Sequence, residues 1–225
     1  MSLVIGPAVD HVGVVVPDLN ASVRWFRDLG FQVSDPTPLH GEGNAPLGQH
    51  SAHIVLPNGY VEISSPVPGS GNHLLPYLAL GPGIRILALA SDSIAADHAR
   101  LSELGMADGP VRSASRVAGQ GTAHFRWFSL SRDFWPGVLV AVVQHLTPEL
   151  VFASELCIHQ NRAKRFVSVD AWRGARDWSA FDCSQSPRPR LALRRGEGGI
   201  FGLSIEAEVA GEHASLDAFD LRLVS

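Results

Sequence analysis

The fold of this chain is decided by the stretch Val9-Asp10-His11-Val12-Gly13-Val14-Val15-Val16-Pro17-Asp18-Leu19. Its first eight residues are rich in β-branched side chains, which is typical of a buried strand. The proline and the polar residues that follow are typical of a helix start, with Asp18 or Asn20 as the N-cap. Gly30 is placed to end that helix. The stretch therefore predicts a strand followed directly by an amphipathic helix.

The same order of elements occurs twice. After the first strand and helix, strands are predicted at 51–56 and 60–64. A second strand at 84–90, a helix that opens at Asp92 and a long apolar strand at 138–143 then repeat the pattern. Each copy is a βαβββ unit, which cannot cover both faces of its own sheet. We therefore expect two such units to pair.

The remaining sequence is interpreted as a smaller third copy. It offers strand-like segments on both sides of a short predicted helix at 171–181. We predict an α+β protein in which paired βαβββ modules form a cupped mixed sheet, followed by a smaller C-terminal βαβββ-like unit. The predicted boundaries are residues 8–66 for the first module, 83–148 for the second and 160–225 for the third unit.

Composition narrows the class of protein. The 225 residues are 45% hydrophobic and 18% charged, which excludes wholesale disorder. A net charge of -4 and a pI of about 6.2 give no global attraction for nucleic acid or an anionic membrane. The apolar runs are strand-sized and the N-terminus lacks a signal-peptide pattern, so we expect a cytoplasmic protein. Cys157 and Cys183 have no metal-binding spacing and are expected to be free thiols.

Three motifs resemble a known superfamily. They are the opening Asp10-His11-Val-Gly-Val-Val-Val-Pro-Asp-Leu, the helix end Leu29-Gly30-Phe31, and Tyr60-Val-Glu62-Ile. Together they resemble the vicinal oxygen chelate superfamily of glyoxalases, bleomycin-resistance proteins and extradiol dioxygenases. The segment 143–149 is similar to its glyoxalase-like branch. The resemblance covers residues 8–150 well and 150–225 loosely, and it implies a cupped sheet with one divalent metal in the cup.

The resemblance places metal ligands on the first and last strands of each module. In the first module these are His11 and Glu62. In the second module Arg85 stands where His11 stands in the first, so that ligand is lost. The last strand offers Gln144, which aligns with Glu62, or the adjacent His145, which is chemically the better ligand. Because neighbouring residues point to opposite faces of a strand, only one of the two is expected in the cup.

Two histidines and one carboxylate would form a facial triad with open positions for a substrate that binds through two oxygens. These donors suit Fe, Mn, Ni, Co or Zn. A buried Glu62 needs a positive partner, which the metal or Arg85 can supply. Glu149 is either a base near the metal or a helix-start residue. Arg85 and Glu149 are the candidate catalytic residues.

Other features leave alternatives open. His53 and His124 occupy equivalent strand positions, whereas His40, His50 and His73 are predicted in loops over the cup. Residues 157–195 hold nine of the eighteen lysines and arginines against three acids. Such a segment is either a solvated face or an attraction for an anionic substrate.

The leading hypothesis is a metal-dependent lyase or isomerase that acts on a small substrate with neighbouring oxygens. The first alternative is an Fe(II) ring-cleaving dioxygenase. The second is a metal-free binding protein whose cleft is walled by aromatic side chains. A small-molecule substrate and a homodimer are the expected partners, without nucleic acid or membrane. The sequence has no P-loop, GxGxxG, GxSxG or HExxH motif. The aromatic walls would be Tyr60, Trp25, Trp127 and Trp135.

Overall fold

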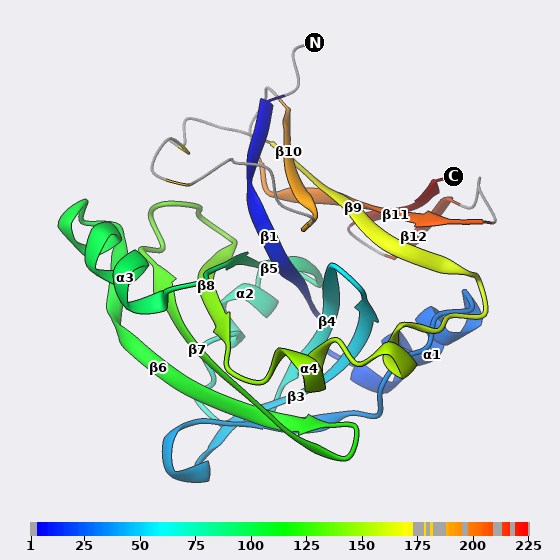
Figure 1. Cartoon of the computed structure of the whole chain (residues 1–225), viewed down its shortest axis with the longest axis horizontal. Helices are drawn as coiled ribbons and strands as arrows, with labels where there is room; N and C mark the ends of the chain where they lie inside the picture. The colour runs from blue at the N-terminus through cyan, green and yellow to red at the C-terminus, as the bar shows by residue number, and fades with distance from the viewer. Residues whose placement is uncertain are drawn as a thin grey trace.

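The computed structural model describes residues 4–172, 178, 181, 188–194, 198–208, 213–216 and 219–224. Within these ranges the strands form one mixed sheet of 13 strands, and α1 (Leu19–Asp28) and α3 (Ile94–Glu103) lie outside it on opposite sides (Figure 1). The helices are short, and none of those described is long and apolar enough to cross a membrane.

The two modules contain the predicted elements in the predicted order. The first comprises β1 (Val4–Val15), α1, β2 (Thr37–His40), η1 (Glu42–Asn44), β3 (Pro46–Leu56) and β4 (Gly59–Pro66). The second follows α2 (Leu75–Leu78) and comprises β5 (Gly83–Ala90), α3, β6 (Ala107–Ala118), β7 (Gly121–Leu130) and β8 (Leu139–His145). The C-terminal elements are α4 (Pro148–Val151), η2 (Ser154–Cys157), β9 (Ala163–Trp172), β10 (Arg190–Arg194), β11 (Ile200–Ala207), β12 (His213–Leu216) and β13 (Phe219–Val224).

Helix α1 forms for the reasons that its sequence indicates. The Asp18 side chain accepts a hydrogen bond from the backbone N–H of Ala21 at 2.9 Å, which caps the first turn. Val23 and Phe26 lie on the buried face. Gly30, with φ of 80°, takes the left-handed conformation that ends the helix. The helix therefore forms directly after β1 in the chain, as predicted.

Strand pairing repeats between the two modules and closes a ring. In each module the first strand pairs in parallel with the last one, β1 with β4 and β5 with β8. The modules then join along two seams, because β1 pairs antiparallel with β5 and β2 contacts β6. The order β1-β4-β3-β2-β6-β7-β8-β5 thus returns to β1. This arrangement confirms the α+β fold with paired modules and a curved mixed sheet.

The C-terminal strands extend this sheet from β1, because the N-terminal part of β1 pairs antiparallel with β10 (Figure 1). Their pairing differs from that of the modules. β9 lies between β10 and β11, while β13 pairs with β11 and β12. The first strand of this unit is therefore not next to its last. Ala171 and Trp172 belong to β9 rather than to the predicted helix, whose other residues, except Trp178 and Phe181, lie outside the described ranges.

A continuous apolar core joins the C-terminal unit to the ring. Val12 and Val14, on the outward face of β1, belong to the same buried cluster as Phe26 of α1, Val169 of β9 and Leu203 of β11. Since side chains alternate along a strand, His11 and Gly13, which each precede one of these valines, point into the ring. The outer face of β1 thus supplies stability, and its inner face is free for a site.

The basic segment forms ion pairs on the surface of the C-terminal unit. Three of its described cations contact glutamates near the end of β11: Arg162 and Lys164 with Glu208 at 2.6 and 3.1 Å, and Arg165 with Glu206 at 2.9 Å. Arg173, Arg176 and Arg195 lie outside the described residues. These pairs favour the interpretation as a solvated face.

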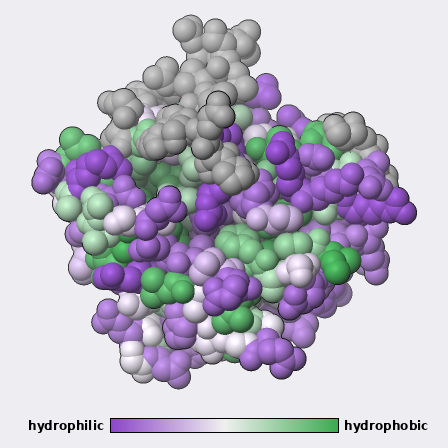
Figure 2. All heavy atoms as spheres, viewed as in Figure 1, coloured by the Kyte–Doolittle hydropathy of each residue, from purple (hydrophilic) through white to green (hydrophobic). Residues whose placement is uncertain are grey.

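Two further expectations concern the surface. Cys157 is a free thiol as predicted, and Cys183 lies outside the described residues. Polar side chains cover most of the face shown in Figure 2, with apolar ones in separate groups between them. No single apolar patch on this face selects a dimer contact, and the homodimer stays a prediction.

The inner face of β1 sets a requirement for glycine at position 13. An added Cβ there would lie 2.5 Å from Cδ1 of Ile86 on the paired strand. We expect Gly13→Ala to lower the free energy of unfolding by about 1–3 kcal/mol, because the crowded contact forces a backbone or rotamer shift. Urea unfolding measures the change.

The matched control is Gly199→Ala, whose added Cβ would meet nothing closer than 3.7 Å. When Ile86→Ala is already present, adding Gly13→Ala should lower the free energy of unfolding by less than it does in the wild type. Equal stability of Gly13→Ala and the control would show that β1 and β5 are less tightly packed than described.

Candidate active site

A cavity of about 60 Å³ lies inside the ring, which is room for a few water-sized groups. Its lining differs between the modules. The first module contributes mainly polar and aromatic side chains: His11, Gln49, His53, Tyr60 and Glu62, with Leu39. His73 comes from the segment between the modules. The second contributes an apolar wall with one cation: Ile86, Phe125, Trp127, Leu139, Ala141, Val143 and Arg116.

The polar wall begins at an irregularity in β1. Val9 pairs with Leu89 and His11 with Ala88, so Asp10 is the extra residue of a bulge. Consecutive side chains of a regular strand point to opposite faces. At this bulge, however, Oδ1 of Asp10 lies 2.8 Å from Nδ1 of His11. The bulge therefore brings both functional groups of the Asp-His pair to one place.

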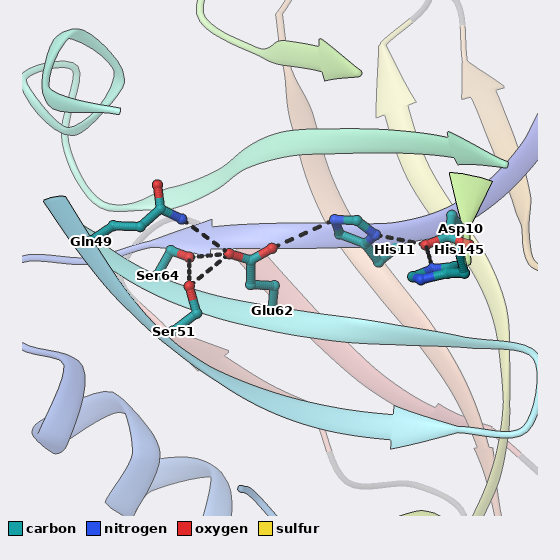
Figure 3. Close-up of polar contacts among 7 residues, drawn as sticks. All are labelled: Asp10, His11, Gln49, Ser51, Glu62, Ser64 and His145. Carbon is teal, nitrogen blue, oxygen red and sulfur yellow. Dashed lines mark hydrogen bonds and ion pairs between the residues drawn. The ribbon is translucent and has the colours of Figure 1, made fainter. Parts of the chain in front are cut away.

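Asp10 is completely buried and holds three cationic or proton-donating groups. Its carboxylate contacts Nδ1 of His11, Nε2 of His145 at 2.9 Å and Nη1 of Arg188 at 2.6 Å (Figure 3 shows the two histidines). Burial by itself raises the pKa of Asp10, but His145 and His11 together lower it well below its ordinary value. The carboxylate is thus ionised and can only accept. Both histidine nitrogens that face it therefore carry protons.

Glu62 is held through one oxygen and free through the other. Oε1 accepts hydrogen bonds from the Oγ atoms of Ser51, at 2.8 Å, and of Ser64, and Nε2 of Gln49 lies 3.5 Å away (Figure 3). Oε2 lies 3.5 Å from Nε2 of His11. Since Nδ1 of His11 donates to the Asp10 carboxylate, Nε2 is the ring nitrogen that faces Glu62 and the cavity.

Tyr60 and Trp127 are the aromatic side chains of the predicted set that line the cavity. Tyr60 stacks on His11 with ring centres 4.2 Å apart. The other two lie elsewhere, and the prediction is wrong for them. Trp135 is buried in the outer core, where Nε1 donates to the carbonyl of Gly198, and Trp25 packs against the core from α1. Trp25 belongs to a helix outside the ring, and Trp135 to the loop between β7 and β8.

The remaining histidines separate into two groups. His53 and His73 line the cavity, and burial is the main cause that lowers the pKa of each. His53 is therefore neutral at pH 7. His40 on β2, His50 on β3 and His124 on β7 are outside the cavity lining.

Arg116 of β6 is the cavity residue that the sequence did not reveal. Only 6% of it is exposed, and its guanidinium lies 5.8 Å from the ring centre of Tyr60. Burial lowers the pKa of Arg116, whereas Tyr60, Glu62 and Asp10 raise it, and an arginine remains charged in either case. Nη1 makes one long contact of 3.4 Å with the carbonyl of Val117, and Nη2 is buried without a hydrogen-bond partner among the described residues.

A weak sequence signal for Arg116 exists. Ala114, Arg116 and Ala118 are buried at alternate positions of β6, and the residues between them are more exposed. A charged residue between two alanines on the buried face of a strand is unusual, because an unpaired buried charge is costly. The weak apolar character of β6 hid this pattern.

The register of the two first strands identifies the counterpart of His11. Helix α3 begins at Ile94, 75 residues after α1 begins at Leu19, and Leu87, which pairs with Val12, follows it by the same 75 residues. This offset makes Ile86 of β5 the counterpart of His11 of β1. Ile86 lines the cavity. The sequence alignment, which gave Arg85 this position, is therefore wrong by one residue.

The same register identifies the counterpart of Glu62. Glu62 pairs with Gly13 across β4 and β1, and Ala141 pairs with Ala88 across β8 and β5. Gly13 of the first module corresponds to Ala88 of the second, in the same way as His11 corresponds to Ile86. Ala141 also lines the cavity. The second module thus has apolar residues at both positions where the first has a histidine and a glutamate.

Arg85 lies outside the cavity, contrary to its predicted role. Its guanidinium donates to the carbonyl oxygens of Leu80, at 2.8 Å, and Gly81, where the chain leaves α2. One position along a strand reverses the side-chain direction. Arg85 therefore holds the turn before β5, and the side chain of its neighbour Ile86 lines the cavity.

Gln144 and Glu149 also lie elsewhere. The amide of Gln144 caps α3, since Nε2 donates to the carbonyl of Asp92 at 2.8 Å and Oε1 accepts from the N–H of Ile94 at 3.3 Å. Glu149 is exposed in the first turn of α4. The alternation of β8 places His145, not Gln144, on the inner side.

His145 does not complete a metal triad. Its Nε2 is committed to Asp10, on the far side of His11 from Glu62 (Figure 3). Within the described ranges no three His, Cys, Asp or Glu side chains converge as a metal site. His11 and Glu62 have suitable donor atoms, but Ile86 and Ala141 supply none, and a buried guanidinium shares the cavity. The residues present therefore do not fit the three-ligand metal site that the resemblance implies.

Residues 9–176 match the model of a family described as "Glyoxalase-like domain". The chain belongs to this family. It is therefore a member of the vicinal oxygen chelate superfamily, as its motifs predict. The comparison with curated proteins gives no match.

The comparison with solved structures gives matches over nearly the whole chain and over part of it. A hypothetical protein from Staphylococcus aureus matches with a TM-score of 0.69 and 10% identity over 99% of each chain. A methylmalonyl-CoA epimerase in complex with methylmalonyl-CoA and NH4+ matches with a TM-score of 0.46 and 23% identity, over 61% of this chain and 94% of that one. The epimerase from Mycobacterium tuberculosis gives a TM-score of 0.42 and 28% identity, over 60% and 86%.

The buried Asp10 carboxylate predicts a specific pH dependence of stability. Its pKa is lower in the folded chain than the ordinary value of 3.8, so protons bind preferentially to the unfolded chain. The stabilisation is present above about pH 4 and is lost as the pH falls further. Asp10→Asn should lower the free energy of unfolding at pH 7 by on the order of 3 kcal/mol, because it removes the buried negative charge that His145 and Arg188 contact.

Urea unfolding at pH 7 and pH 3 measures this effect, and the difference between wild type and Asp10→Asn should shrink at the lower pH. The control is Asp35→Asn, an exposed partner of Arg27 whose loss should change stability by less than about 1 kcal/mol. A difference that stays the same at both pH values would contradict the ionised state of Asp10.

Proposed function

We propose that this glyoxalase-like protein is a lyase or isomerase that transfers a proton on a small substrate with neighbouring oxygens. The observation that carries the proposal is the pair formed by Glu62 and His11. Oε2 of Glu62 and Nε2 of His11 lie 3.5 Å apart at the cavity, while the opposite atom of each group is held by other side chains. A pair fixed in this way resembles a general acid–base centre.

The two supports of the pair have different effects. Asp10 orients the His11 ring, in the way that a buried carboxylate orients a catalytic histidine. Ser51 and Ser64 hold one oxygen of Glu62, so that the other is directed to the cavity. Neither group needs to reorient when a proton moves between a substrate carbon and the pair. Such preorganisation is a main source of catalytic rate.

The second wall favours a substrate with an apolar part. Ile86, Leu139, Ala141 and Val143 offer no hydrogen bonds and exclude water from the carbon skeleton of a ligand. An adjoining hollow shares His73, Trp127 and Leu139 with the cavity. The hollow also contains the exposed Arg112 and Arg132, which suit an anionic end of the substrate, beside Asp108, Tyr77, Ser129 and Leu130.

Ring-cleaving dioxygenation is less well supported. That chemistry uses Fe(II) held by two histidines and one carboxylate. Here His145 faces Asp10 and not Glu62, so the third ligand is missing from the set. Proton transfer by His11 and Glu62 requires only the groups that the cavity contains.

A second candidate is a metal-free protein that binds a small molecule without changing it. The apolar and aromatic wall formed by Phe125 and Trp127 supports it, because sequestration needs complementary surface rather than a base. The two candidates differ in whether a bound compound exchanges a carbon-bound proton.

The test uses hydrogen–deuterium exchange into a panel of small 2-oxo and 2-hydroxy acids in D₂O, followed by NMR. An enzyme should catalyse exchange at the carbon next to the carbonyl or carboxylate. Glu62→Gln should slow this exchange by about 10²- to 10⁴-fold, because the base is lost while the shape remains. The control Glu149→Gln should leave the rate unchanged, since Glu149 is exposed on α4.

The binding candidate gives a different result. Compounds would then quench tryptophan fluorescence without exchange in any variant. Exchange that is equally fast in Glu62→Gln would contradict the assigned role of Glu62.

A further inference from the structure

We infer that Arg116 is the anion receptor of this cavity and binds two neighbouring oxygens of a carboxylate or enediolate, in the role that a metal would have. The natural substrate class rests on the proposed function, but the binding of such an anion does not. The site joins a cation from the second module to the acid–base pair of the first.

The guanidinium of Arg116 is a buried charge that makes no direct ion pair with a described residue. Among the described residues no carboxylate lies within 4 Å of it, and Nη2 has no hydrogen-bond partner. Burying an unpaired charge is costly, and proteins compensate such a charge with a partner. Arg116 lines the same cavity as Glu62 and His11. An anion that enters this cavity would supply the missing partner.

The contacts that Arg116 does make are too weak to explain its burial. The bond from Nη1 to the carbonyl of Val117 is long, at 3.4 Å, and joins neighbours in the chain. The ring of Tyr60, 5.8 Å away, provides a modest cation–π attraction. A purely structural arginine would have its donors satisfied by backbone carbonyls, as those of Arg85 are.

The chemistry of the ligand follows from the shape of the donor. A guanidinium is a planar fork that holds two oxygens at once, as in bidentate pairs with carboxylates. A metal that binds a substrate through neighbouring oxygens recognises the same arrangement. Ile86 and Ala141 occupy the positions of the second module's ligands, and the cation that this module contributes to the cavity lining is Arg116. It would stabilise negative charge on oxygen while the Glu62–His11 pair handles the proton.

The experiment titrates oxalate, a dianion with neighbouring oxygens, into metal-stripped full-length protein with and without EDTA. Calorimetry and tryptophan fluorescence report binding, since Trp127 lines the cavity. We expect saturable binding that EDTA does not change. Arg116→Met should weaken it by on the order of 10- to 100-fold, since a hydrogen-bonded charge pair is lost. Arg116→Lys keeps the charge but not the fork and should fall between the two.

The matched control is Arg126→Met on the adjacent strand β7, where the side chain is exposed and outside the cavity lining. It should bind oxalate like the wild type. Thermal unfolding of each variant checks the fold. If Arg116→Met does not fold, the titration of Arg116→Lys decides, because lysine keeps a positive charge at this buried position.

Three results would overturn the inference: no oxalate binding by the wild type, equal affinity in folded Arg116→Met or Arg116→Lys, or binding that EDTA abolishes and Mn²⁺ restores. The last would place a metal at His11 and Glu62. If oxalate binds through Arg116 but no compound exchanges a proton, the receptor stands and the proposed enzyme function fails.

Discussion

The ionised carboxylate of Asp10, enclosed at the bulge of β1, is the interaction on which the rest of the site depends. It joins His11 of the first module, His145 of the second and Arg188 from the chain just before β10. A carboxylate without access to water is tolerated only with such partners. The C-terminal unit is therefore part of the site's support, and not only an extension of the sheet. The orientation of His11, and with it the geometry at Glu62, follows from this contact.

The ring of strands surrounds a cavity whose two sides have diverged. The modules share topology and pairing, yet the positions of His11 and Glu62 correspond to Ile86 and Ala141. One side carries the Glu62–His11 pair, and the described lining of the other side is apolar apart from the buried cation Arg116. This division supports acid–base chemistry on a small anion. It also explains how a fold associated with metal chelation can keep the recognition of paired oxygens without the full set of ligands.

Sequence patterns predicted the features that local signals encode, and the repetition of those signals predicted the paired modules. The two βαβββ modules, the N-cap of α1 and the inward direction of His11 and Glu62 were all accessible, because alternation and caps are local signals. The errors come from register. The first strands were aligned one residue out of register, which exchanges Arg85 for Ile86 between the faces of a strand. The last strands were aligned with Gln144 opposite Glu62, where the pairing gives Ala141. The bulge at Asp10 and the buried donors of Arg116 arise from tertiary contacts, which a single sequence does not encode locally. The pairing of the C-terminal strands likewise depends on tertiary contacts.

The central claim is that Arg116, rather than a metal on His11 and Glu62, holds the oxygens of a ligand. A crystal structure grown with both oxalate and Mn²⁺, with anomalous data to locate manganese, tests it most directly. We predict that two oxalate oxygens lie within hydrogen-bond distance of the Arg116 guanidinium, without an anomalous peak in the cavity. A manganese ion bound by Nε2 of His11 and Oε2 of Glu62, with oxalate on the metal, would contradict the account.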